Sequence, residues 1–195
     1  MRQDPAIILI SGTSHVGKST LAGKLARTLG WKSLSTDSLA RHPGRPWPAV
    51  RREVAEFYEG LGAHTIHWFL KVHHENLWPR IRTEIEAALQ AGTPLVIEGA
   101  ALRPEYVATL EPGRLSAVLL HADDAFLRAR MLLESGHAEA APRVARLIET
   151  FIERSLRDNR DLLDAARATG LRCVDAGVSG ALETLAEEFA ARAGR

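Results

Sequence analysis

The stretch Gly12-Thr13-Ser14-His15-Val16-Gly17-Lys18-Ser19 decides how this chain folds. Its two glycines are separated by four residues and followed by lysine and serine, which is the spacing of a phosphate-binding loop. The apolar run before it (6–10) indicates a buried strand, and residues 19–29 after it have helical spacing. A glycine-rich turn between a strand and a helix start lets successive backbone N–H groups point at one anion. We therefore expect phosphate binding here rather than a chance connection.

The loop, called the P-loop below, predicts how a nucleotide is held. Its phosphates are expected to contact Gly12, Thr13, Ser14, His15, Val16, Gly17, Lys18, Ser19 and Thr20. Lys18 can reach the outer phosphates, and Ser19 can offer its hydroxyl to Mg²⁺. Because the chain contains no Asn-Lys-x-Asp sequence of the kind that specifies guanine, we expect ATP with Mg²⁺.

Length and composition predict one domain and exclude some partners. The 195 residues, 46% of them hydrophobic, can bury one sizeable core, and the formal net charge is only +1. Such a balanced charge argues against nucleic acid or a membrane surface as the partner. Cys173 is the single cysteine, so an intrachain disulfide cannot form, and it is expected to be buried in a strand. Since Met1–Pro5 is polar and the next apolar run is short, we expect a cytoplasmic protein.

Strands and helices alternate along the rest of the sequence. The predicted strands are 6–10, 31–35, 95–99, 115–120 and 171–174. The predicted helices are 19–29, about 50–60, 66–77, 81–91, 124–134, 143–168 and 180–192, with Pro79 either kinking one helix or starting a new one. Strands that are apolar on both faces indicate an α/β fold, a parallel sheet covered by helices on both sides.

Two acidic residues follow predicted strands and are expected to lie beside the P-loop. Ligands bind beyond the carboxyl ends of parallel strands, and this rule selects Asp37 and Glu98. One can accept a proton from an attacking hydroxyl, and the other can order Mg²⁺ and its water. We favour Asp37 as the base and Glu98 as the acid on the metal side, although the roles could be exchanged. The alternatives are a helix N-cap for Asp37 and a solvated loop acid for Glu98.

Arginines gather around a break of small residues at 135–142. Arg143, Arg146, Arg154 and Arg157 fall within an arc of about 80° on the following helix, and Arg128 and Arg130 flank the same gap. They could contact phosphates or face solvent. A mobile lid over about 131–146 would bring arginines onto the transferring group, whereas a plain surface loop is the alternative.

The segment 41–80 is expected to form a helical cap that binds the acceptor. It is rich in tryptophan, arginine and histidine. His64, His67 and His74 have helical spacing, but no carboxylate or cysteine in the segment completes a zinc set, so packing or surface roles are expected for these histidines and for His73.

The P-loop segment Ile10–Ala22, together with Ser35-Thr36-Asp37-Ser38 and Val96-Ile97-Glu98-Gly99, resembles the small P-loop kinases related to adenylate, shikimate and gluconate kinases. These motifs are most similar to the P-loop part of 2-phosphoglycerate kinases. The resemblance implies a three-layer sandwich, a five-stranded parallel sheet in the order 2-3-1-4-5, and a phosphotransferase that uses ATP and Mg²⁺.

The resemblance also implies site residues. It places an acceptor near Asp37 and Glu98, a catalytic lid arginine near Arg130 or Arg143, and adenine between the Arg128 region and the loop that contains Gly177. His15 stands where many such kinases have a small residue and could crowd or contact a phosphate.

We therefore expect a kinase that transfers the γ-phosphoryl group of ATP to a hydroxyl or phosphate of a small metabolite, 2-phosphoglycerate-like or a sugar acid. One alternative is a nucleoside or nucleoside-monophosphate kinase, with Trp47 and Trp68 stacking on the base. Another is a nucleotide-binding switch or accessory ATPase. The expected oligomeric state is a monomer or a homodimer.

Overall fold

Five parallel strands form the centre of the computed structural model, which describes residues 6–111 and 113–193. They are β1 (Ile7–Ser11), β2 (Lys32–Ser35), β3 (Leu95–Glu98), β4 (Leu115–His121) and β5 (Cys173–Asp175). Neighbouring strands pair in parallel in the order β2-β3-β1-β4-β5, which confirms the predicted α/β fold and strand order. Met1–Pro5, the polar segment behind the expectation of a cytoplasmic protein, lie outside the described residues.

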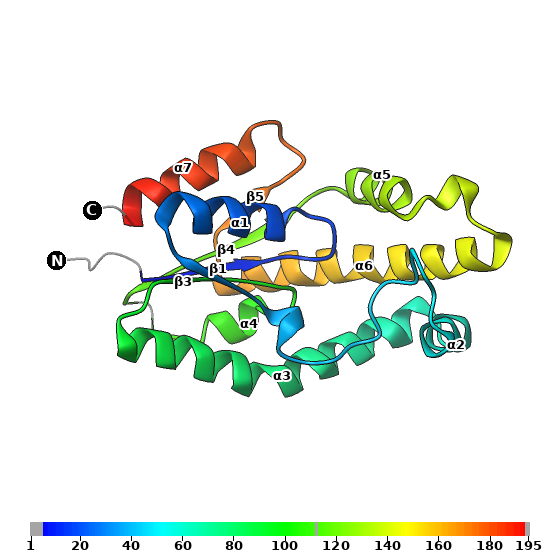
Figure 1. Ribbon diagram of the computed structural model, residues 1–195, viewed down its shortest axis with the longest axis horizontal. Helices are drawn as coiled ribbons and strands as arrows, with labels where there is room; N and C mark the ends of the chain where they lie inside the picture. Colours follow the sequence, from blue (N-terminus) through cyan, green and yellow to red (C-terminus); the bar gives the residue numbers. More distant parts are fainter. Residues whose placement is uncertain (1–5, 112, 194–195) are drawn as a thin grey trace.

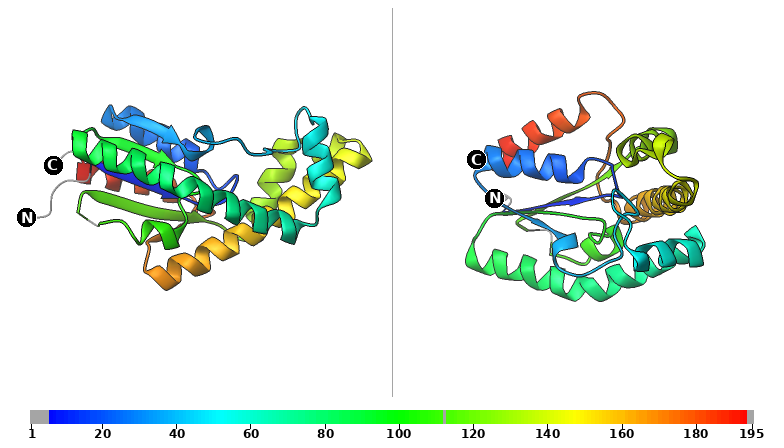
Figure 2. Two further views of the ribbon diagram at one scale, coloured as in Figure 1. Left: turned by 90° about the horizontal axis from the view of Figure 1, so that it is seen from below. Right: turned by 45° about the vertical axis from the view of Figure 1, so that its right-hand side comes forward.

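Helices cover both faces of the sheet and extend beyond the carboxyl ends of the strands (Figures 1 and 2). Their bounds are α1 (Lys18–Leu29), α2 (Arg52–Gly60), α3 (Ala63–Ala91), α4 (Pro104–Val107), α5 (Asp124–Ser135), α6 (Pro142–Thr169) and α7 (Ala181–Ala193), with short 3-10 turns η1 (Thr36–Ser38) and η2 (His137–Glu139). α1 and α7 lie on one face, and α3, α4 and α6 lie on the other. No helix in the described ranges has both the length and the apolar character needed to cross a membrane.

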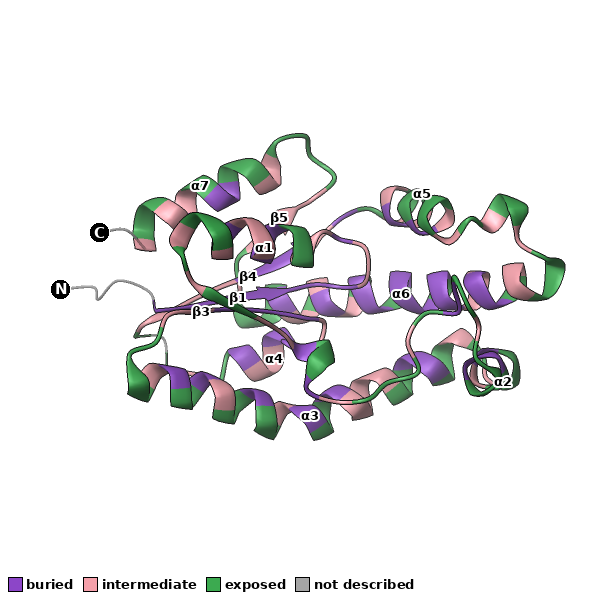
Figure 3. Cartoon of the chain, viewed as in Figure 1, coloured by how far each residue is buried: buried purple, intermediate pink, exposed green. Residues whose placement is uncertain are grey.

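The core is divided between the two faces by the pleat of the central strand. Ile8 and Ile10 of β1 belong to the apolar cluster under α1 and α7, whereas Ile7 and Leu9 belong to the cluster under α3. All four side chains are at most 1% exposed, and Figure 3 shows β1 buried along its length. Burying one such side chain stabilises the fold by about 1.5–3 kcal/mol.

The helix α3 runs unbroken through Pro79, so the predicted alternative of a new helix starting there is wrong. Leu77 and Ile81, on either side of the proline, are buried in one apolar cluster against the sheet. This packing outweighs the backbone hydrogen bond that proline cannot donate. The helix ends at Gly92, which adopts the left-handed conformation with a φ of 61°.

The last strand is shorter and more exposed than predicted. β5 begins at Cys173 rather than at Leu171, and it lies at the edge of the sheet beside β4. An edge strand has one neighbour, so Cys173 is only half-buried and the expectation of a fully buried thiol is wrong. Burial still raises the pKa of this thiol.

The carboxyl ends of the strands point toward the half of the molecule built by α2, α5 and the first parts of α3 and α6 (Figure 1). The segment after η1 contains no helix until Arg52 and crosses this end of the molecule. The fold therefore places the P-loop, the residues after β2 and β3, and the cap around one space.

Candidate active site

The P-loop has the backbone that its glycines predict. Gly12 has a φ of 146°, and a Cβ atom there would lie 2.6 Å from the carbonyl oxygen of Leu120. Gly17, with a φ of 103°, is the residue before the first turn of α1. These conformations and this close approach exclude a side chain at Gly12 and favour glycine at both positions.

Lys18 is held inside the loop. Its Nζ donates a hydrogen bond to the carbonyl oxygen of Thr13 at 2.6 Å. Burial lowers the pKa of Lys18, and the carboxylates of Glu98 and Asp37 oppose this effect. Thr13 Oγ1 in turn donates to the carbonyl oxygen of Ser155 at 3.0 Å, which fixes the loop to α6.

Ser19 and Glu98 meet at the start of α1. Ser19 Oγ donates a hydrogen bond to Glu98 Oε1 at 3.2 Å. Glu98 is buried at the end of β3, where it pairs in register with Ile10 and Ser35. A hydroxyl and a carboxylate are the hard oxygen donors that Mg²⁺ prefers beside phosphate oxygens and water. The pair fits the metal-side role predicted for it.

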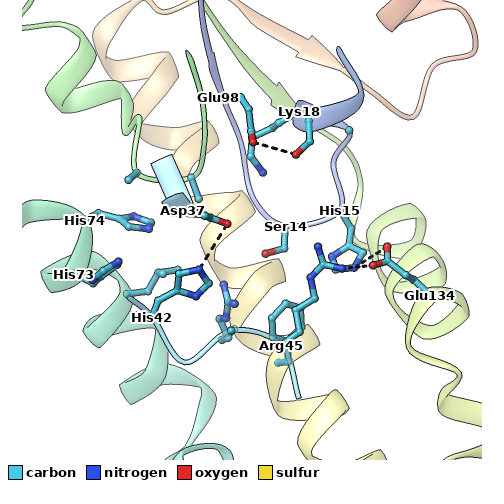
Figure 4. Close-up of a pocket in the computed structure, with 18 of the residues that line it drawn as sticks. Ser14, His15, Lys18, Asp37, His42, Arg45, His73, His74, Glu98 and Glu134 are labelled. Carbon is cyan, nitrogen blue, oxygen red and sulfur yellow. Dashed lines mark hydrogen bonds and ion pairs between the residues drawn. The ribbon is translucent and has the colours of Figure 1, made fainter. Parts of the chain in front are cut away.

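Asp37 lies in the turn η1 after β2 and is exposed. Its Oδ2 is 3.8 Å from His42 Nε2, a contact visible in Figure 4. The next α-helix, α2, begins only at Arg52, so Asp37 is not an α-helix N-cap. The turn is held by the close approach of Thr36 to Gly99, where a Cβ atom would lie 1.7 Å from Thr36 Oγ1.

These side chains line one cavity of about 280 Å³ (Figure 4). Its walls include Lys18, Ser19, Asp37 and Glu98, as predicted from the sequence. Further polar wall residues come from the cap, α5 and α6: His42, Arg45, His73, His74, Arg130, Glu134 and Arg154. The structure thus brings the P-loop, both predicted carboxylates and two of the predicted arginines together.

Other predicted residues lie outside that cavity's walls. Arg143 donates to Glu59 of α2, with Nη2 at 2.9 Å from Oε2, and both side chains are exposed. Arg128 pairs with Glu149. Arg157 lines a separate groove between α3 and α6. Gly177 donates its N–H to Asp175 Oδ1 at 2.8 Å.

The two tryptophans suggested as stacking surfaces are not among the cavity's wall residues. Trp47 is buried, and its ring centroid lies 4.8 Å from that of Phe151. Trp68 is 56% exposed and lines the groove between α3 and α6.

His15 has an unexpected position. It is the one non-glycine residue with a positive φ, 65°, in the described part of the chain. Its ring packs near Trp47 and Phe151, and its Nε2 lies 3.1 Å from Glu134 Oε2. Burial lowers the pKa of His15 to about 4, which keeps the imidazole neutral at pH 7. Arg45 pairs with the same Glu134, so cap, P-loop and α5 meet there (Figure 4).

A buried ionic network behind the site was not predicted. Arg103, 1% exposed, pairs with Glu105, Asp158 and Asp161. Burial raises the pKa of Asp158, but the polar contact with His67 and the charges of His74, Arg103 and Arg154 outweigh this effect and hold the pKa well below its usual range. His67 Nε2 lies 3.6 Å from Asp158 Oδ1. Asp158 and Asp161 lie three residues apart on α6, but no local sequence pattern linked them to Arg103.

A family model described as an AAA domain matches residues 8–149. The chain belongs to this AAA domain family. A relative of this AAA domain chain, a 2-phosphoglycerate kinase from Methanococcus maripaludis (strain C7), is 31% identical over 121 residues. The match covers 53% of this chain and 38% of that enzyme, so the chain spans well under half of the relative's length.

Solved structures of other proteins have the same fold as this AAA domain chain. A gluconokinase from Sinorhizobium meliloti 1021 is 24% identical with a TM-score of 0.51, and the match covers 100% of this chain and 94% of that one. An uncharacterised protein from Eubacterium ventriosum is 12% identical with a TM-score of 0.54, covering 98% and 99% of the two chains. The predicted small P-loop kinase fold is confirmed.

Proposed function

We propose that the protein is an ATP-dependent kinase that transfers the γ-phosphoryl group to a small-molecule acceptor. The observation that carries this proposal is the meeting of Lys18, the Ser19–Glu98 pair and Asp37 on the walls of one cavity. The relationship to a 2-phosphoglycerate kinase supports a phosphotransferase. It also favours a hydroxyl-bearing or phosphate-bearing acid as the acceptor, either 2-phosphoglycerate-like or a sugar acid.

In the proposed reaction the P-loop holds ATP. Its backbone N–H groups, with Ser14 and Thr20 beside them, face the phosphates, and Lys18 leaves the carbonyl of Thr13 to bind the outer ones. Asp37 accepts the proton of the acceptor hydroxyl as the oxygen forms its bond to the γ-phosphorus. The bond between that phosphorus and the bridging oxygen breaks, and ADP leaves with the electron pair.

Ser19 and Glu98 are the residues that would hold Mg²⁺. Their oxygens lie within 3.2 Å of one another beside the P-loop, which suits a small cation that keeps several waters and phosphate oxygens. Bound there, Mg²⁺ would neutralise phosphate charge during transfer.

The cap and the lid complete the proposed enzyme. Residues 41–80 supply the acceptor side of the cavity through His42, Arg45 and His73. In the lid (131–146), Glu134 contacts His15, and Arg143 contacts Glu59 of the cap. We assign Arg130, exposed on the cavity wall, to the transferring phosphoryl group. Arg128 and Gly177 remain the proposed adenine neighbours.

The test is ATP consumption by the purified protein with Mg²⁺ and a library of hydroxy acids, phosphorylated acids, sugar acids and nucleosides. An acceptor should stimulate ADP formation, and Lys18→Ala and Asp37→Asn should each remove the stimulation by about 10²-fold or more. Thr150→Ala, a change on an exposed face of α6, serves as the control. Tight ATP binding without stimulation by any acceptor would contradict the proposal.

A further inference from the structure

A second cavity adjoins the first on the side of the cap. The two share a wall formed by His42, Gly44, Leu70, His73 and Arg154. The second cavity has a volume of about 240 Å³, which is the volume that about eight water molecules occupy in the liquid. The five shared residues place the two cavities side by side.

The second cavity is lined mainly by apolar side chains from two helices. Phe57 and Tyr58 come from α2, and Ile66, Phe69 and Leu70 come from α3. The ring centroids of Phe57 and Phe69 lie 6.5 Å apart, so the two rings form part of one aromatic wall. A wall of this kind gains free energy by covering an apolar group.

Polyhydroxylated groups do not suit the apolar wall of this cavity, because its polar side chains, Arg41, His42, His73 and Arg154, belong to the rest of the lining. The hydroxyl of Tyr58 already donates to the carbonyl oxygen of Gly44 at 3.0 Å. The other residues of the aromatic and aliphatic wall offer no polar side-chain atom. A sugar placed there would leave hydroxyls without partners, at a cost of about 1–3 kcal/mol for each buried group.

Arg154 lies on the wall that the two cavities share. Its charge acts on Asp158, which pairs directly with Arg103, but no carboxylate of the described residues contacts Arg154 itself. Its residue surface is 8% exposed, and it makes no hydrogen bond or ion pair with any residue that the structure describes. The guanidinium carbon lies 4.4 Å from the ring centroid of Phe151. No carboxylate is among the residues that line the second cavity. A buried arginine without a carboxylate is costly unless a ligand supplies the negative charge.

We propose that the acceptor is a hydroxy acid that carries an apolar or aromatic substituent. Its acidic group pairs with Arg154, its substituent occupies the cavity lined by Phe57 and Phe69, and its hydroxyl lies in the first cavity with Asp37. The inference rests on the proposed function for the transfer step only, because binding of such an acid can be measured without transfer.

The test compares three probes by titration calorimetry on the full chain. They are 3-phenyllactate, lactate, which lacks the ring, and 3-phenylpropane-1,2-diol, which lacks the acid. The protein should bind 3-phenyllactate about tenfold or more tightly than either of the others. Phe69→Ala should shrink the preference for the ring, whereas Val72→Ala, an apolar truncation that lines the groove between α3 and α6 instead of this cavity, should keep it.

The preference for 3-phenyllactate over the diol tests whether Arg154 binds the acidic group. Arg154→Gln should bring the affinities for 3-phenyllactate and the diol together, and Arg154→Lys should retain part of the difference. Thermal unfolding of each variant shows whether it is folded. Equal binding of 3-phenyllactate and lactate by the unchanged protein, or an acid preference that survives in folded Arg154→Gln, would overturn the proposal.

Phosphoryl transfer, measured on the same samples, separates this inference from the proposed function. If 3-phenyllactate binds as expected but no acid stimulates ATP consumption, the kinase proposal fails and the acid site stands. If small polar acids are phosphorylated in a Lys18-dependent reaction while 3-phenyllactate does not bind, the kinase stands and this inference is overturned.

Discussion

His15 of the P-loop and Glu134 of α5 are joined across the site, with 3.1 Å between Nε2 and Oε2. This contact, together with Arg45 on the same carboxylate, connects the P-loop to α5 and to the segment between η1 and α2. Because the imidazole is enclosed, its protonation is coupled to folding.

Stability is expected to fall in mild acid because of His15 and His74. Burial lowers their pKa values to about 4 and about 3, below the 6.5 of an unfolded chain. Below pH 6.5 the unfolded chain takes up protons that the folded chain excludes, so unfolding becomes more favourable. Each histidine adds a slope of at most about 1.4 kcal/mol per pH unit. Urea unfolding between pH 7.5 and 4.5 should show this slope, and His74→Gln should flatten it. Equal slopes for variant and parent would contradict the account.

Two arginines of the lid region are expected to differ in importance. Arg130 lines the cavity, whereas Arg143 is paired with Glu59 on the surface. Arg130→Gln should lower kcat by about 10²-fold or more, and Arg143→Gln should change it by less than about threefold. Steady-state kinetics with the acceptor found by the library screen decides this. A large loss in Arg143→Gln would mean that Arg143 leaves Glu59 during turnover.

Gly99→Ala is expected to disturb the turn that carries Asp37. The new Cβ would lie 1.7 Å from Thr36 Oγ1, so β3 and η1 must separate. We expect a loss of about 1–3 kcal/mol in the free energy of unfolding, with a fall in kcat. Gly60→Ala, where a Cβ meets nothing within 4 Å, is the control. Unfolding curves that coincide for the two variants would show that the turn adapts freely.

The network around Arg103 is expected to matter for folding. Arg103→Leu leaves Asp158 buried without its main cation and should cost about 3–5 kcal/mol in the free energy of unfolding. Arg172→Leu breaks an exposed pair with Glu188 and should cost no more than about 1 kcal/mol. Denaturant titrations of the two variants measure the difference, and similar small losses would exclude a stabilising role for Arg103.

Glu98→Gln should raise the Mg²⁺ concentration needed for half-maximal turnover by about tenfold or more. The amide keeps the shape of the side chain and its contact with Ser19 while removing the charge. Titration of Mg²⁺ at saturating ATP tests this, with Thr150→Ala as the unaffected control. A kcat that falls without any change in the Mg²⁺ requirement would assign Glu98 to the acceptor instead.

The P-loop and the two carboxylates could be predicted because each is fixed by local sequence and by one rule of topology. Asp37 follows β2 and Glu98 ends β3, two strands that lie side by side, and the carboxyl ends of parallel strands meet at one edge of the sheet. Nothing beyond the alternation of strands and helices was needed to bring them to Lys18.

The arginines of α6 show where this reasoning ended. Arg143 and Arg154 share one arc of the helix, but their eleven-residue separation corresponds to about 16 Å along its axis. Angular position therefore did not reveal that Arg154 reaches the cavity while Arg143 pairs with Glu59. The contact of His15 with Glu134 and the role of Arg103 were not predicted for a related reason, because the partners come from α5 and α6, far away in sequence.

The helix α6 supports the P-loop, the sheet and the walls of both cavities. It holds the P-loop through Ser155, packs on β4 through Leu162 and presents Arg154 to both cavities. The cap residues before α3 meet that helix from outside, through Trp47 and Tyr58 against Phe151. Because Trp47 and Tyr58 are buried in the same core as α6, variation within residues 41–62 must keep these two side chains, whereas the P-loop keeps its own support from Ser155.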